Sequence, residues 1–186
     1  MKEKKTAAFL TQAAIIAAIY VVLSLLTYQF SYLEIQCRVA EALCMTIFYT
    51  PAGVFGVFIG CLITNILGGH VIDMIFGSLA TLIAALLTLP IANRIRAKHG
   101  SVLQIKHSLL IPIPTVIVNA LIIPFVLYFG YGVTEFGSQT TTLGVLGLLA
   151  FSVFAGEMIS CYVFGPILVT VLNRVRVTAK LDIKRD

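Results

Sequence analysis

The fold is decided near the start of the chain, where residues Thr6–Tyr28 read TAAFLTQAAIIAAIYVVLSLLTY, without one charged side chain. An α-helix rises 1.5 Å per residue, so roughly 20 residues cross about 30 Å of hydrocarbon. The stretch is too long for the apolar region of a signal peptide, and no small-residue cleavage site follows it. It therefore predicts a retained transmembrane helix over Ala7–Thr27.

The composition of the whole chain agrees with this. Of its 186 residues, 59% are hydrophobic and 11% charged, and the mean hydropathy is +1.01. Soluble domains carry about 45–50% apolar and about 25% charged residues, so an ordinary water-soluble protein is excluded. The low charge also argues against a nucleic-acid-binding protein, despite the net charge of +5. The four cysteines have no CxxC spacing and the histidines are not clustered, so no metal site is expected.

Five further helices are expected, at 38–50, 51–67, 73–91, 108–129 and 143–172. The apolar run 38–69 is too long for one upright helix, and Pro51 predicts a break within it. The predicted fold is all-α, a bundle of six transmembrane helices that forms a single membrane domain over residues 1–186.

The positions of the basic residues predict the orientation. If the N-terminus is cytoplasmic, six spans place on the inner side the N-terminal segment, the 92–107 loop and the C-terminal tail. These segments hold 12 of the 13 basic residues, the bias that the positive-inside rule describes. They are Lys2, Lys4, Lys5, Arg94, Arg96, Lys98, Lys106, Arg174, Arg176, Lys180, Lys184 and Arg185. Both termini are therefore expected to be cytoplasmic, and Arg38 is the exception on the outer side.

Several polar side chains fall where lipid is expected, and with this topology all lie in the outer half of the bundle. They are Arg38, Glu41, Asn65, Asp73, Asn119 and Glu157. Ionisable groups at membrane depth are costly unless they face the protein interior or a wet cavity. The set predicts a pocket that opens to the outside rather than a continuous pore.

Some of these residues also have purely structural interpretations. Arg38 and Glu41 are spaced i, i+3 and can pair with each other. Asp73 can cap a helix N-terminus, and Asn65 can satisfy the backbone at the Gly68-Gly69 turn. Both interpretations stay open beside a ligand role.

Asn119 can join two helices by a hydrogen bond. Glu157 is the hardest to explain structurally, because no basic residue near it in sequence lies at the same depth. Tyr28, Phe30 and Tyr32 alternate in the expected outer loop. They fit an interfacial aromatic belt as well as a lid that stacks on a planar ligand. Acids, amides and rings together suit a flat heterocycle with adjacent N–H donors, although small cations fit too.

The first helix carries two overlapping pairs of small residues four positions apart: Ala13, Ala14, Ala17 and Ala18. Such spacing lets another helix approach closely, within the bundle or from a partner subunit. The sequence contains no G-x-x-x-x-G-K-[ST] phosphate loop, nucleophile elbow or H-E-x-x-H pair. A chain that is not an enzyme and binds no cofactor of its own is expected.

Four segments together resemble one family. They are IQCRVAEAL at 35–43, FGSLATL at 76–82, VNAL at 118–121 and GEMISCY at 156–162. With the Ala-x-x-x-Ala spacing of the first helix, the chain resembles the QueT family, substrate-binding S components of energy-coupling factor (ECF) transporters.

The resemblance implies capture of a queuosine precursor, a 7-deazaguanine such as preQ0, preQ1 or queuine. It also implies a complex with a transmembrane coupling subunit and two ATPases, in which the S component topples in the membrane. Glu41 and Glu157 would accept the N–H donors of the deazapurine, and Arg38, Asn65 and Asn119 would bind its carbonyl or orient the acids. Asp73 would favour the ammonium group of preQ1, and the alanine face of the first helix would dock the coupling subunit.

Other functions stay open. A stand-alone ion-coupled transporter would use Asp73 and Glu157 as protonatable groups, although the inverted repeats typical of that class are absent. An S component for another vitamin and a purely structural membrane protein are further alternatives.

Overall fold

The computed structural model describes residues 2–27, 38–69 and 71–182, and over these residues every regular element is helical. The predicted all-helical class is therefore confirmed. The elements are α1 (Lys2–Leu26), the 3-10 helix η1 (Val39–Met45), α3 (Thr46–Tyr49), α4 (Ala52–Leu67), α5 (Val71–His99), α6 (Ile105–Ser108), α7 (Ile113–Phe125), the π-helix η2 (Val126–Gly130), α8 (Thr142–Ile159), the π-helix η3 (Ser160–Phe164) and α9 (Gly165–Asp182).

Within the described part of the chain, four helical stretches are long and apolar enough to cross a membrane. They are Thr6–Leu26, Val71–His99, Ile105–Gly130 and Thr142–Val175. Val39–Tyr49 and Ala52–Leu67 are apolar but shorter. The 16 residues of α4 rise only about 24 Å at 1.5 Å per residue, less than the hydrocarbon thickness. Where the sequence predicts six spans, the described residues thus contain four long apolar helical stretches and two shorter ones.

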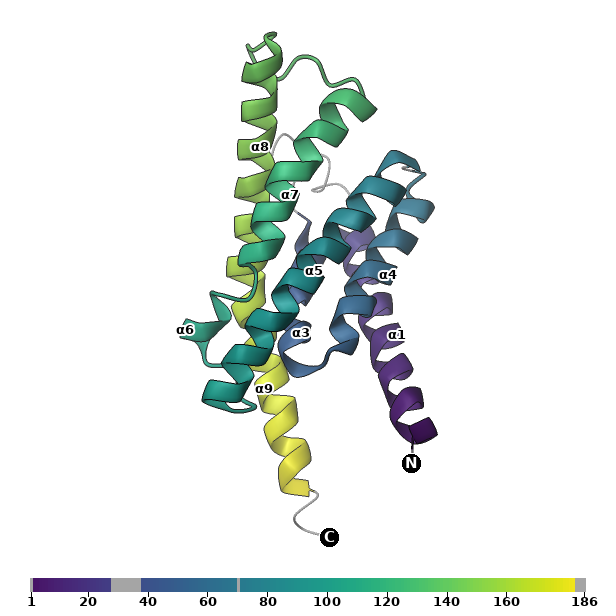
Figure 1. The fold of residues 1–186 in the computed structure, drawn as a ribbon, viewed down its shortest axis with the longest axis vertical. Helices are drawn as coiled ribbons and strands as arrows, with labels where there is room; N and C mark the ends of the chain where they lie inside the picture. The colour runs from purple at the N-terminus through teal and green to yellow at the C-terminus, as the bar shows by residue number, and fades with distance from the viewer. Residues whose placement is uncertain (1, 28–37, 70, 183–186) are drawn as a thin grey trace.

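The long helices form a chain of neighbours (Figure 1). α1 packs on α4, α4 on α5, α5 on α7, and α7 on α8, while η1 contacts η3. The start of α1 and the end of α9 lie at one end of the molecule. The α4–α5 and α7–α8 connections lie at the opposite end.

The break expected at Pro51 is present. α3 ends at Tyr49, Thr50 is extended with φ −150° and ψ 136°, and α4 begins at Ala52. A proline disfavours helical backbone in the residue before it, which explains the conformation of Thr50. The chain therefore changes direction between Tyr49 and Ala52, and η1 with α3 forms a short helical segment distinct from α4.

α5 is longer than expected, because the predicted helix 73–91 continues to His99 despite Pro90. Ala92 and Ile95 are buried beyond the proline, and the Arg96 guanidinium donates to the Phe48 carbonyl at 3.1 Å. These contacts stabilise the helix past the hydrogen bond that proline removes. The predicted loop 92–107 is therefore helical over its first half.

Two other helices differ in their ends. The predicted helix 108–129 begins at Ile113, after a turn that contains Pro112. The predicted helix 143–172 runs on without a loop from α8 through η3 into α9 and ends at Asp182. Pro166 lies at the start of α9, where its missing N–H is compatible with the preceding π-helical turn.

Candidate functional site

The site is built around buried polar side chains on different helices. Glu41, Asn65, Asp73, Asn119 and Glu157 are each only 2–3% exposed. Charged and amide groups at this burial need partners, because water cannot solvate them. The predicted residues are therefore internal, and their hydrogen bonds define the geometry of the site.

Glu41 lies on η1 and accepts two hydrogen bonds at one oxygen. The Tyr20 hydroxyl of α1 donates to Glu41 Oε1 at 2.6 Å, and the Thr81 hydroxyl of α5 lies 3.4 Å from the same atom. Arg38, at the start of η1, forms its ion pair with Asp73 Oδ2 of α5 at 3.1 Å. The pair thus connects two elements rather than residues one turn apart.

Asp73 lies in the first turn of α5, at the end of the molecule opposite the two termini. The Asn65 amide donates to the Asp73 backbone carbonyl at 2.9 Å, so it joins α4 to α5 instead of serving the Gly68-Gly69 turn. Asp73 Oδ2 receives Arg38, while Asp73 Oδ1 is buried without a hydrogen-bond partner. A buried carboxylate oxygen left in this state is a ready acceptor for a ligand donor.

Tyr131 lies beside this carboxylate, just beyond η2. Burial, and then the negative charge of Asp73, raises the pKa of the Tyr131 phenol. The ring therefore stays neutral at ordinary pH and is a hydroxyl-bearing neighbour of Asp73.

Asn119 and Glu157 form the second half of the site. The Asn119 amide of α7 donates to Glu157 Oε1 of α8 at 2.7 Å. The hydrogen bond expected to join two helices through Asn119 is therefore made to Glu157 itself. The Cys161 thiol of η3 lies 3.9 Å from Glu157 Oε2. Glu41 and Glu157 lie on elements that are in contact, because η1 packs against both α8 and η3. The two halves are therefore parts of one polar cluster.

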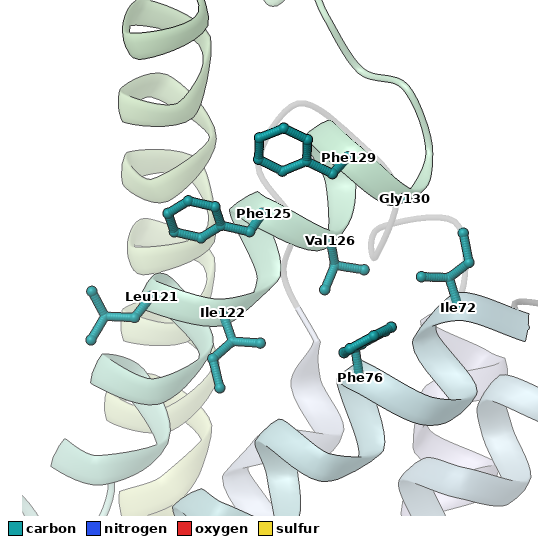
Figure 2. Close-up of a pocket in the computed structure, with 8 residues that line it drawn as sticks. All are labelled: Ile72, Phe76, Leu121, Ile122, Phe125, Val126, Phe129 and Gly130. Atoms are coloured by element: carbon teal, nitrogen blue, oxygen red, sulfur yellow. The ribbon is translucent and has the colours of Figure 1, made fainter.

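An apolar pocket of about 570 Å³ adjoins the cluster (Figure 2). It lies between the start of α5 and the C-terminal end of α7 with η2, and its lining contains no polar side chain. The lining residues are Ile72, Phe76, Leu121, Ile122, Phe125, Val126, Phe129 and Gly130. Ile72 directly precedes Asp73, and Gly130 directly precedes Tyr131. The polar cluster is therefore packed closed, with an apolar hollow at its edge.

The alanines of α1 divide between two surfaces. Ala13 and Ala17 are buried against α4, where a Cβ on Gly56 or Gly60 would lie 3.1 Å from their backbone oxygens. For these two alanines the small-residue spacing serves packing within the bundle, one of the two interpretations of that spacing. Ala14 and Ala18 are exposed.

The sequence prediction missed several polar neighbours of the acids and of Asn65. They are Tyr20, Cys61, Ser78, Thr81 and Tyr131. For Tyr20 a signal existed, since a tyrosine hydroxyl inside an apolar helix needs a polar partner. The predicted ring of Tyr32 lies outside the described residues. Over the described residues, no three His, Cys, Asp or Glu side chains gather as metal ligands would.

Several apolar helices long enough to span a membrane, around buried acids and amides, define a multi-pass membrane protein with an internal polar site, an arrangement that suits a solute carrier. The comparisons make this specific. The family model described as QueT transporter matches residues 10–174, and the chain belongs to this family.

One relative is the queuosine precursor transporter QueT of Lactococcus lactis subsp. cremoris (strain MG1363). It is 41% identical over 85 residues, which are 45% of this chain and 50% of that protein. The chain thus matches about half the length of this relative. No solved structure matches the chain.

Proposed function

We propose that the chain is the substrate-binding S component of an ECF importer and captures a 7-deazaguanine queuosine precursor from outside the cell. Membership of the QueT transporter family and the name of the Lactococcus lactis relative support this. The observation that carries the proposal is the pair of buried acids, Glu41 and Glu157, on the contacting elements η1 and α8.

The chemistry of a guanine-like edge fits this pair. Its ring N–H and amino group are adjacent donors, and carboxylate oxygens accept such donors in charge-assisted hydrogen bonds. Glu41 and Glu157 take these roles, while Asn119 and Asn65 orient the acids or bind the carbonyl with Arg38. Asp73, with its unpartnered Oδ1, is the acceptor for an ammonium group when the substrate is preQ1.

In the proposed topology the chain crosses the membrane six times, with both termini in the cytoplasm. The two shorter apolar helices, 39–49 and 52–67, together with the four long ones, make up the six spans of this topology. The shared end of α1 and α9 and the distribution of the basic residues support this orientation. In this topology the closed polar cluster lies in the outer half of the bundle, and substrate binding requires it to open toward the outer face.

Energy for uptake comes, in this proposal, from partner subunits. The sequence has no phosphate-loop motif, so ATP hydrolysis belongs to two ATPases joined through a transmembrane coupling subunit. The exposed Ala14 and Ala18 of α1 are the small residues that remain available to dock that subunit.

Calorimetry on the detergent-purified protein tests the substrate. Titration with preQ0, preQ1, queuine and guanine should give tight binding of a deazaguanine and much weaker binding of guanine. If a folded sample binds none of the deazaguanines, the substrate proposal fails, and an S component for another vitamin becomes the better hypothesis.

Uptake assays test the energy source. Cells that express the chain with its partner subunits should accumulate labelled precursor until ATP is depleted, and should be insensitive to collapse of the proton gradient. The opposite result would instead support an ion-coupled transporter in which Asp73 or Glu157 carries the proton.

A further inference from the structure

Tyr20 connects α1 directly to the acid pair. Its side chain is 2% exposed, and its hydroxyl donates to Glu41 Oε1 at 2.6 Å. The hydroxyl of Thr81 lies 3.4 Å from the same oxygen. Both contacts thus use Oε1, and a carboxylate offers acceptor sites on both of its oxygens.

The position of Tyr20 is in turn set by Gly60 of α4. A Cβ on Gly60 would lie 2.5 Å from Tyr20 Cβ and 2.8 Å from its Cγ, a distance that real side chains do not tolerate. One turn earlier on α4, a Cβ on Gly56 would lie 2.6 Å from Ile16 Cβ. The two helices therefore approach closely at two glycines, but only Gly60 contacts Tyr20, the residue whose hydroxyl donates to Glu41.

We propose that Tyr20 is a positioning residue for substrate binding: it fixes Glu41 through Oε1 so that Oε2 meets the N–H donors of the substrate. The inference rests on the proposed function, because it assigns Glu41 a substrate. It makes α1, whose opposite face is exposed, part of the binding site.

A double-mutant cycle tests this role by calorimetry. The titrant is whichever of preQ0, preQ1 and queuine the parent protein binds most tightly, and the variants are Tyr20→Phe, Glu41→Gln and both together. Tyr20→Phe should weaken binding roughly tenfold to a hundredfold, the loss expected for a hydrogen bond to a charged group. In the Glu41→Gln background the same change should alter the affinity less than about twofold, because Tyr20 acts through Glu41.

Tyr49→Phe is the matched control. It also removes a tyrosine hydroxyl, here on a half-buried side chain, which donates to Asn173 Oδ1 at 2.8 Å on α9 and not to the acids. Its binding should equal that of the parent. Equal weakening by Tyr20→Phe with and without Glu41, or an unchanged affinity in Tyr20→Phe, would overturn the inference.

The two glycines give an independent test. Gly60→Ala and Gly56→Ala introduce similar overlaps, so both should lower the unfolding temperature, but only Gly60→Ala should weaken binding about tenfold or more. Equal affinity losses in the two folded variants would contradict the role of Tyr20. If Gly60→Ala does not fold, the double-mutant cycle decides alone.

The failure of this inference is distinct from the failure of the proposed function. A parent protein that binds no deazaguanine removes the proposed function, and the inference falls with it. A parent that binds, together with a Tyr20→Phe variant that binds equally well, removes only the role of Tyr20.

Discussion

Glu41 and Glu157 each have one carboxylate oxygen in a close hydrogen bond, to Tyr20 at 2.6 Å and to Asn119 at 2.7 Å. Neutral donors of this kind fix an acid in place without cancelling its charge. An arginine in the same position would compete with a cationic or N–H-bearing ligand. The two acids are therefore held in place and keep their capacity to accept further donors.

At the residue scale, Glu41→Gln and Glu157→Gln should each weaken deazaguanine binding roughly tenfold to a hundredfold, since each loses a charge-assisted hydrogen bond. Calorimetry measures the effect. Glu135→Gln is the control, because Glu135 is an exposed acid in the α7–α8 connection, and its affinity should equal that of the parent. If the two buried variants bind as the parent does, the donor assignment is wrong.

Asp73→Asn should change selectivity more than overall affinity. Its unpartnered Oδ1 is the proposed acceptor for the ammonium of preQ1, whereas preQ0 lacks that amine. Loss of the charge should therefore weaken preQ1 at least about tenfold relative to preQ0. The measurement is the ratio of the two dissociation constants, which corrects for any general disturbance from losing the Arg38 ion pair. An unchanged ratio would show that Asp73 only anchors Arg38.

The sequence identified the acids and amides because such groups stand out in apolar helices. It did not identify Tyr20 or Thr81, since their hydroxyls are common in transmembrane helices and only the fold shows which carboxylate they reach. The i, i+3 spacing of Arg38 and Glu41 also pointed to a local pair, whereas Asp73 is the ion-pair partner, 35 residues away. The ion-pair partner of Arg38 is set by tertiary packing, which the spacing of residues along the sequence does not reveal.

At the scale of the element, α1 has two faces with different tasks. Ala13 and Ala17 face α4 and allow the helices to touch at Gly56 and Gly60. Ala14, on the other face, is exposed. Both faces have the same small-residue spacing, so the sequence predicted the close approach but not which pair of alanines was used inside the bundle.

Replacing the two kinds of alanine should therefore have different effects. Ala17→Leu should lower the free energy of unfolding by about 1–3 kcal/mol, because it overpacks a tight helix contact. Ala14→Leu should change stability by less than about 0.5 kcal/mol, as surface substitutions usually do, yet reduce co-purification with the coupling subunit. Thermal unfolding and affinity pull-down measure the two effects. Normal assembly and transport in Ala14→Leu would place the docking face elsewhere.

The helix ends were predicted less well than the helices. α5 continues past Pro90 because Ala92 and Ile95 are buried against the core. Local rules for proline do not include the stabilisation that this tertiary burial provides. The break at Pro51 was predicted, because there the preceding residue and the turn agree with the local preference. Local rules therefore succeeded where tertiary packing did not oppose them.

At the scale of the whole molecule, the shared end of α1 and α9 leads to a test of topology. In a Cys37→Ser background, single cysteines at Lys98 and Ser138, both exposed, should react with a membrane-impermeant maleimide from opposite sides. Ser138→Cys should be labelled on intact cells, and Lys98→Cys only after permeabilisation. Labelling of both on intact cells would contradict the six-span orientation, while the buried Cys44, Cys61 and Cys161 should stay unreactive.

The uninterrupted run of α8, η3 and α9 has a mechanical consequence. Its segments contain 18, 5 and 18 residues, which makes a rod of about 60 Å at 1.5 Å per residue, against about 40–45 Å for a whole bilayer. In the proposed topology this run of helix therefore extends beyond the bilayer, with Glu157 in its outer half and its last turns in the cytoplasm. Any tilt of the protein moves the end of α9 through a wide arc, so a partner protein bound to that end would control the tilt of the whole protein from the aqueous phase.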